Sequence, residues 1–280
     1  MRLTVWGCRG SVPTPGAATV RYGGNTSCVE LSLDNGTVIV LDAGTGIRPL
    51  GQKLVGSGAT RIHVLLTHLH LDHVEGLRFF APLWSPQVSV DIWGPPSPVS
   101  SLEERIARSF SPPLFPIDLR GVPAQVEFRD VPRDPWTLDG ALLSATLVVH
   151  PGPTVGFRIE TPEAIVGYLP DHEPALAGAI GTRPPDWISG GAVAAAADVL
   201  LHDAQYSEDE YRQRIGWGHS SVADAVAFAR AVEARRLLLF HHEPEHDDAA
   251  LDRLEEHARL LADAEGLGPA LAREGMVVEL

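Results

Sequence analysis

Short apolar runs, separated by glycine, proline and polar residues, recur along the whole sequence. Runs of this kind, rich in valine, leucine and isoleucine and bounded by turn residues, are typical of buried strands. The Asn35-Gly36 pair between two of them predicts a hairpin turn. The runs predict strands at residues 3–6, 28–33, 37–42, 62–66, 88–93, 126–131, 142–149, 155–159, 164–168, 199–202 and 237–240.

Helices are expected between these runs, at residues 44–54, 99–110, 222–234 and 248–265. In the last of them Leu251, Leu254, Ala258 and Leu261 fall on one helical face. No linker, charge run or low-complexity segment divides the chain, so we expect one α/β domain in which helices cover the faces of sheets. The proline-rich segment 111–116 could be a lid or a plain surface connection.

The densest group of polar side chains lies in segment 67–73, directly after a predicted strand. It holds His68, His70, Asp72 and His73, and zinc and similar divalent metals prefer imidazole and carboxylate ligands. In an extended segment His68 and His70 point the same way because they are two positions apart. Asp72 and His73 are adjacent and diverge, which suits a second metal beside the first. The alternative is a histidine-rich surface loop, which the flanking apolar runs disfavour.

The same segment also carries a helix-start pattern. Asp72 is followed three residues later by Glu75, which predicts Asp72 as a helix N-cap. The metal ligands would then lie on a strand-to-helix turn.

A site for two metals needs more ligands than this segment offers. Four further candidates, His150, Asp171, Asp203 and His241, stand at the ends of predicted strands, where α/β proteins place their sites. One polar residue after a strand is usually a plain loop residue. Four of them downstream of a metal-binding pattern make a shared site the better interpretation.

Composition limits the partners and the compartment. The formal net charge of −14 disfavours a broad nucleic-acid-binding face, which needs clustered cations. Small anionic substrates stay compatible because bound metal ions dominate a local field. The chain starts on a strand-like run without a basic-then-apolar leader, and it has no long uncharged apolar stretch. We therefore expect a cytoplasmic protein without a membrane-spanning segment. In the cytoplasm Cys8 and Cys28 would be reduced; a disulfide between them is the alternative.

Segment 67–73 resembles the HxHxDH motif of the metallo-β-lactamase superfamily of metallohydrolases, and the resemblance continues over nearly the whole chain. It implies a four-layer αββα sandwich of the metallo-β-lactamase type, formed by residues 1–280 as one domain. It also implies two divalent metal ions, with zinc as the expected metal and manganese or iron as alternatives.

The resemblance assigns the candidate ligands. His150, followed by a Gly-Phe-Arg strand, resembles the third-motif histidine, and Asp171 resembles the aspartate that bridges the metals. His241 stands in the place of the last ligand, with His242 as its competitor, and Asp42 resembles the first-motif aspartate that supports the ligands. The implied ligands are His68, His70 and His150 for the first metal, Asp72, His73 and His241 for the second, and Asp171 for both.

Two more segments narrow the branch of the superfamily. Gly218-His219-Ser220-Ser221 and the 201–206 segment with Asp203 resemble the phosphodiesterase branch, which contains ribonuclease Z and cyclic-nucleotide phosphodiesterases. There a histidine of this motif, paired with an acidic residue, assists at the phosphate. The resemblance implies this role for His219 with Asp203 as partner, although the family often has glutamate at that place. A structural role beside a helix cap is the alternative for His219.

The resemblance thus implies a dinuclear-metal hydrolase that cleaves phosphodiester bonds, above all in small cyclic nucleotides, by a metal-bridging hydroxide. The catalytic residues would be His219, Asp203 and Asp72. The alternatives are a carboxylic-ester or lactone hydrolase on the same metals, a metal-bearing sensor without turnover, and a nuclease.

The chain departs from bacterial ribonuclease Z at one place. Only twelve residues separate Arg158 from Asp171, whereas ribonuclease Z inserts a tRNA-gripping arm in this interval. We therefore expect a small-molecule phosphodiester and not tRNA as the substrate. Relatives in this branch often form dimers, and the resemblance leaves a homodimer open here.

Overall fold

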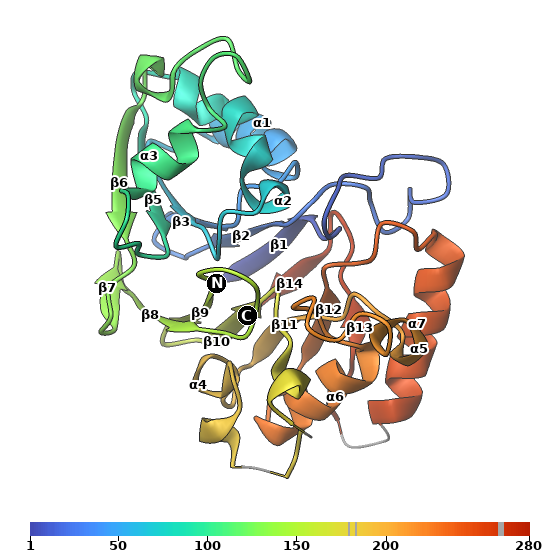
Figure 1. The fold of residues 1–280 in the computed structure, drawn as a ribbon. Helices are drawn as coiled ribbons and strands as arrows, with labels where there is room; N and C mark the ends of the chain where they lie inside the picture. Colours follow the sequence, from blue (N-terminus) through green and yellow to red (C-terminus); the bar gives the residue numbers. More distant parts are fainter. Residues whose placement is uncertain (179, 183, 263–265) are drawn as a thin grey trace.

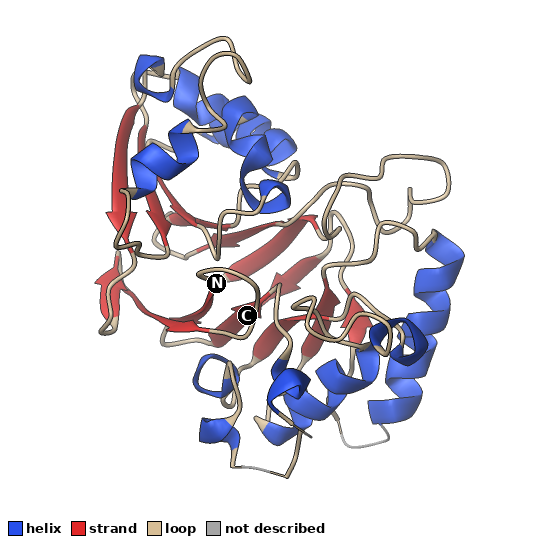
Figure 2. Cartoon of the chain, viewed as in Figure 1, coloured by secondary structure: helices blue, strands red, loops and turns tan. Residues whose placement is uncertain are grey.

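The computed structural model describes residues 1–178, 180–182, 184–262 and 266–280. Two seven-stranded sheets pack face to face, and helices cover the outer face of each (Figures 1 and 2). This is the predicted αββα arrangement. Apolar side chains of both sheets, among them Leu3, Val5, Phe157 and Tyr168, form the core between them.

The first sheet is mixed, with both antiparallel and parallel strand pairs. Its strands, in spatial order, are β14 (Val277–Glu279), β1 (Arg2–Gly7), β2 (Cys28–Ser32), β3 (Val38–Leu41), β4 (Arg61–Leu65), β5 (Ser89–Gly94) and β6 (Gln125–Asp130). The pairs from β14 to β3 are antiparallel, and those from β3 to β6 are parallel. Asp42 and segment 67–73 therefore follow the neighbouring parallel strands β3 and β4 and lie at the same end of the sheet, where the carboxyl ends of these strands meet.

The second sheet is built in the same mixed way. Its strands, in spatial order, are β13 (Ala270–Leu271), β12 (Leu237–Phe240), β11 (Val199–Asp203), β10 (Ile165–Leu169), β9 (Val155–Glu160), β8 (Ala141–Leu147) and β7 (Trp136–Leu138). From β10 to β13 the pairs are parallel. The carboxyl ends of β10, β11 and β12 thus bring Asp171, Asp203 and His241 to one edge.

Each outer layer has its own apolar core. Leu50 packs with Phe80 on the first sheet, and Phe228 packs with Leu251 on the second. The first layer contains α1 (Ile47–Ser57), α2 (Leu71–Val74), α3 (Leu102–Ala107) and the 3-10 helices η1 (Glu75–Phe79), η2 (Ala81–Trp84) and η3 (Leu119–Gly121). The second contains α4 (Gly191–Ala194), α5 (Glu208–Tyr211), α6 (Val222–Ala231), α7 (Asp248–Ala262), η4 (Pro174–Ala177) and η5 (Pro185–Trp187).

The predicted strands are found with shifted ends, whereas the short strands β7, β13 and β14 were not predicted. The helix expected at 99–110 corresponds to α3, which ends at Ala107 and begins later than expected because Ser101 and Glu104 form a capping box at its start. The helix expected at 248–265 corresponds to α7. Residues 263–265 of the expected range lie outside the described part of the chain. Cys8 and Cys28 are both buried free thiols, so the disulfide alternative was wrong. Within the described residues, no helix combines the length and apolar character needed to cross a bilayer.

Candidate metal centre

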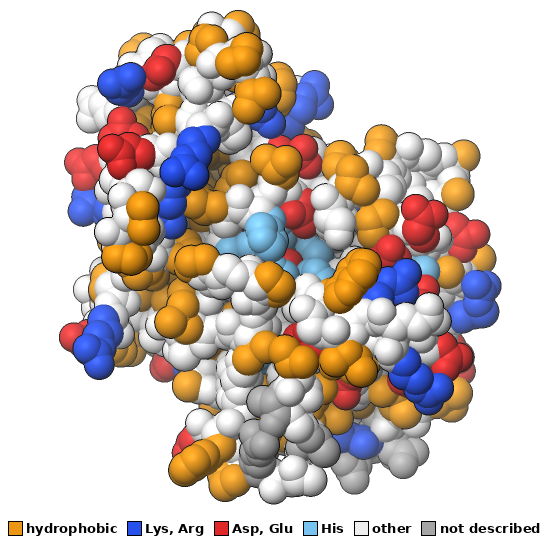
Figure 3. All heavy atoms as spheres, viewed as in Figure 1, with side chains coloured by type: hydrophobic (Ala, Val, Ile, Leu, Met, Phe, Trp, Pro, Cys, Tyr) orange, Lys and Arg blue, Asp and Glu red, His pale blue; other side chains and the backbone are white. Residues whose placement is uncertain are grey.

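Histidine side chains gather at the floor of a hollow between the two halves of the molecule (Figure 3). Segment 67–73 leaves the end of β4 and turns into α2. The remaining candidate ligands arrive from loops that follow β8, β10 and β12 of the other sheet. The hollow therefore lies where the carboxyl ends of strands from both sheets meet.

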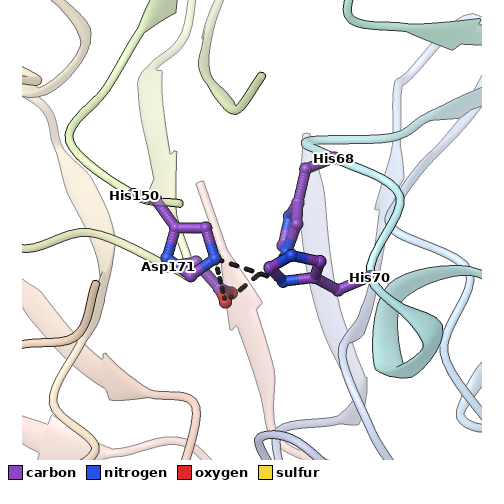
Figure 4. A group of neighbouring side chains, drawn as sticks. All are labelled: His68, His70, His150 and Asp171. Carbon is purple, nitrogen blue, oxygen red and sulfur yellow. Dashed lines mark hydrogen bonds and ion pairs between the residues drawn. The ribbon is translucent and has the colours of Figure 1, made fainter. Parts of the chain in front are cut away.

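The first group of possible ligands is His68, His70, His150 and Asp171, whose ligand atoms all lie within 4.8 Å of one another. Figure 4 shows their side chains converging. Oδ2 of Asp171 lies 3.7 Å from Nε2 of His68 and 3.6 Å from Nε2 of His150. Nδ1 of His70 lies 3.3 Å from Nε2 of His150.

The second group is Asp72, His73 and His241. Oδ2 of Asp72 lies 3.3 Å from Nε2 of His73 and 3.2 Å from Nε2 of His241. Oδ1 of Asp171 lies 3.0 Å from the same atom of His73 and 3.3 Å from that of His241. Asp171 therefore faces the first group with one carboxylate oxygen and the second group with the other.

The donor atoms of this site suit a metal. Nε2 of His68, Nε2 of His73 and Oδ1 of Asp171 are buried and have no hydrogen-bond partner among the described residues. Buried polar atoms normally have such a partner, so three that face one another are the arrangement expected of atoms that bind a cation. Burial also lowers the pKa of His68, His70 and His150, which favours the neutral imidazole that binds metals. These residues fit a metal-binding site.

Hydrogen bonds on the far side of the rings orient the histidines. Asp42 accepts the Nδ1–H of His73 at 2.8 Å and the backbone N–H of Thr67 at 2.8 Å. The Tyr168 hydroxyl donates to the same carboxylate at 3.0 Å. The first bond occupies Nδ1 of His73, so Nε2 of that ring is directed into the cluster. The other two bonds hold the loop at Thr67 and the Asp42 carboxylate itself in place. Sequence reasoning found Asp42 but not Tyr168.

Two other histidines are oriented by residues that the sequence did not predict. The Nδ1–H of His150 donates to the Gly218 carbonyl at 2.9 Å, and that of His241 donates to the Gln205 amide oxygen at 3.2 Å. Gly218 also has to be glycine, because a Cβ there would lie 2.5 Å from Nδ1 of His150 and its φ is +94°. The contact to the Gly218 carbonyl leaves no residue-type signal of its own, whereas the close approach to His150 accounts for the glycine at this position.

Asp72 does not cap α2, so that prediction was wrong. The N-cap is His70, which makes no side-chain cap bond. The Asp72 carboxylate points to the second ligand group and accepts the backbone N–H of Ser11 at 2.8 Å. His242, the competitor of His241, lies outside the ligand groups: its Nε2–H donates to the Ala272 carbonyl at 2.7 Å, and burial lowers its pKa to about 3.

Beside these two ligand groups lies a pair of residues, Asp203 and His219, and His219 also forms a third possible ligand group with Asp171 and His241. Nδ1 of His219 is 2.6 Å from Oδ2 of Asp203, and its ring stacks on that of His241 with centroids 4.8 Å apart. Burial lowers the pKa of His219, but the charge of Asp203 and its hydrogen bond outweigh burial and raise that pKa to about 9. The pair therefore favours an imidazolium beside the metal ligands.

A buried glutamate fixes the loop that carries His219. The Glu173 carboxylate accepts the backbone N–H groups of Gly216 at 2.8 Å and Gly218 at 2.7 Å, and the Tyr211 hydroxyl at 3.0 Å. Through Gly218 it also supports His150. Sequence reasoning missed Glu173, although a glutamate two residues after a candidate ligand could have drawn attention to it.

The proline-rich segment 111–116 is attached to the first helical layer. The Phe115 ring packs against Phe110 and Phe79, with centroids 5.0 and 5.8 Å away. A cleft beside His68 and His70 is lined by residues on both sides of this segment in the sequence, Ser109 and Pro151 among them, but not by the segment itself. In this structure the segment is a surface connection.

Comparisons of sequence place the chain among known proteins. A family model described as a beta-lactamase superfamily domain matches residues 37–242. The ribonuclease Z of Haloarcula marismortui is 28% identical over 316 aligned positions, which cover 99% of this chain and 96% of that protein. The ribonuclease Z of Mycobacterium avium is 29% identical over 286 positions, which cover 96% and 94%.

Solved structures share the fold. The metallo-β-lactamase fold protein YhfI from Bacillus subtilis superposes with a TM-score of 0.71 at 18% identity, over 99% of this chain and 98% of that chain. A diphosphatase from the PhnP family gives 0.70 at 19% identity, over 100% and 97%. The short form of human tRNase Z gives 0.66 at 22% identity, over 100% and 99%.

Proposed function

Because the chain belongs to the metallo-β-lactamase superfamily and has the His/Asp metal site of its hydrolases, we propose that it is a dinuclear-metal phosphodiesterase acting on small cyclic nucleotides. Two divalent ions, zinc by the chemistry of the donors, would share Asp171. The first would be held by His68, His70 and His150, and the second by Asp72, His73 and His241.

The observation that carries this proposal is the Asp203–His219 pair. The His219 ring, which Asp203 favours as an imidazolium, has its Nδ1 3.9 Å from Oδ2 of Asp171 and lies next to the place where the substrate would meet the metals. A phosphodiester needs such a cation, because negative charge builds on its oxygens and on the leaving group. Ester and lactone hydrolysis has less need of a fixed proton donor at this position.

The metal ions, when bound, would lower the pKa of a water molecule and neutralise charge on the phosphate. Side chains of the protein supply the proton transfer. As the oxygen of water bonds to phosphorus, the water loses a proton to solvent. As the ester P–O bond breaks, His219 gives the proton on Nε2, the ring nitrogen that Asp203 does not hold, to the leaving oxygen. Asp203 holds the ring in the orientation for this transfer, and His219 then regains a proton from solvent.

The size of the substrate is supported by two features. The strands β9 and β10, which lie on either side of residues 161–164, are joined by this short turn alone, so no arm projects between them. The net charge of −14 also opposes a long polyanion. We therefore favour a small diester over tRNA, although the similar proteins of Haloarcula marismortui and Mycobacterium avium are named ribonuclease Z.

A second candidate function is carboxylic-ester or lactone hydrolysis on the same ligands. It is favoured by the apolar part of the cleft beside His68, where Leu71 and Val74 contribute to the lining. Apolar walls of this kind suit an acyl chain as well as a nucleoside.

A substrate panel separates these candidates. Zinc-loaded protein is assayed with 2′,3′- and 3′,5′-cyclic nucleotides, a linear dinucleotide, an acyl lactone and a tRNA precursor. The proposal predicts turnover of at least one cyclic nucleotide that stops on chelation. Lactone turnover with inert diesters would move the protein to the second candidate, and cleavage of the tRNA precursor alone would make it a nuclease.

A further inference from the structure

A cleft of about 400 Å³ opens beside His68 and His70. Its lining comes from four places: segment 68–74, Ser97, residues 105–109 at the end of α3, and the loop 151–153. Figure 3 shows blue cationic side chains on the α3 side of the histidine hollow, with apolar side chains around the rim. The cleft thus adjoins the metal ligands and is the place into which the rest of a bound substrate would extend.

Two arginines line this cleft, and they differ in their partners. Arg105 is engaged, since its guanidinium donates to the Pro95 carbonyl at 2.6 Å and lies 3.7 Å from Asp130. Arg108, three positions later and on the same side of the helix end, is exposed, and its guanidinium forms no hydrogen bond or ion pair with a described residue. In a chain with net charge −14, a guanidinium without a carboxylate partner beside the site is notable.

We propose that Arg108 binds a second phosphate group of the substrate, so that the natural substrate is a nucleotide with a phosphate in addition to the diester that is cleaved. This inference rests on the proposed phosphodiesterase function. The apolar walls formed by Leu71, Val74 and Ile106 would pack against the nucleoside between the two phosphates. A guanidinium binds phosphate through two parallel hydrogen bonds, which gives both affinity and orientation.

The test compares two esters that release the same p-nitrophenol. One is thymidine 5′-(p-nitrophenyl phosphate), and the other is the same ester with an added 3′-phosphate. The ratio of their kcat/KM values is measured for the zinc-loaded wild type, Arg108→Ala and Arg108→Lys. Arg133→Ala is the matched control, because Arg133 is also an exposed arginine without an ion pair to a described residue but lies outside the cleft.

We expect the wild type to favour the 3′-phosphorylated ester by about tenfold or more. The ratio falls to about one in Arg108→Ala, stays intermediate in Arg108→Lys and is unchanged in Arg133→Ala. Equal turnover of both esters by the wild type, or a preference that survives in Arg108→Ala, overturns this inference and leaves the proposed function intact. If the zinc-loaded protein cleaves neither of the two esters and none of the cyclic nucleotides, the proposed function itself is contradicted.

Discussion

His219 is held by Asp203 at 2.6 Å, and the second oxygen of the same carboxylate accepts the backbone N–H groups of Gln205 at 3.0 Å and Ser220 at 3.1 Å. The carboxylate is fully buried and cannot rotate without breaking these bonds. His219 is therefore oriented before any substrate arrives. Such preorganisation lets a proton donor act without reorganising in the transition state.

Replacement of His219 with alanine should leave the metal content unchanged and reduce diester turnover by a factor of about 10²–10⁴, because only the proton donor is lost. The measurements are metal content and kcat on the same preparation. His257→Ala is the control, since His257 pairs with Glu208 on the surface. Unchanged turnover in His219→Ala would remove His219 from the mechanism.

Replacement of Asp171 with alanine should release most of the bound metal, because this carboxylate faces both ligand groups. Metal content after dialysis is the measurement, and circular dichroism checks that the variant is folded. Asp209→Ala, which changes an exposed carboxylate, should keep its metal. A folded Asp171→Ala protein with full metal content would show that the shared ligand is misassigned.

Replacement of Glu173 with glutamine should lower both stability and kcat. Oε1 of Glu173 accepts Gly216 and Oε2 accepts Gly218, so a glutamine, which has an NH₂ group in the place of one oxygen, leaves one buried N–H without its partner. The free energy of unfolding should fall by about 1–3 kcal/mol. Urea unfolding and turnover are measured beside Glu163→Gln, an exposed control. If Glu173→Gln matches the wild type in both, the glutamate does not anchor this loop.

His202 should make the protein less stable in mild acid. Burial lowers its pKa from 6.5 to about 4, and it faces another buried histidine, His172, at 2.9 Å. The unfolded chain takes up this proton near pH 6.5 and the folded chain only near pH 4, so stability falls as pH decreases through this window. The loss from His202 amounts to about 3 kcal/mol at most. Urea unfolding at pH 7 and pH 4.5 should show a smaller decrease in His202→Gln than in the wild type, and equal decreases would contradict this account.

The sequence is most informative where chemistry is local. The i, i+2 spacing of His68 and His70 and the strand-end position of Asp171 can be read without a fold, because both depend on near neighbours along the chain. The helix start at Ser101 was also readable from its glutamate three residues later, a signal that the helix prediction overlooked.

Other features depend on contacts between distant segments. Glu173 meets Gly216 only because β10 and β11 lie side by side, and Gln205 meets His241 through the neighbouring β12. The short strands β13 and β14 have too few residues for a periodic pattern, and their pairing partners are more than thirty positions away in the sequence. Such features follow from tertiary packing and not from local preference.

The most direct test of the account is a zinc titration of the chelated protein, with hydrolysis of bis-p-nitrophenyl phosphate followed at each addition. The two ligand groups around Asp171 predict negligible turnover in the chelated protein and full turnover at about two zinc ions per chain. Undiminished turnover in metal-free protein, or two bound zinc ions without any diester cleavage, would contradict the account.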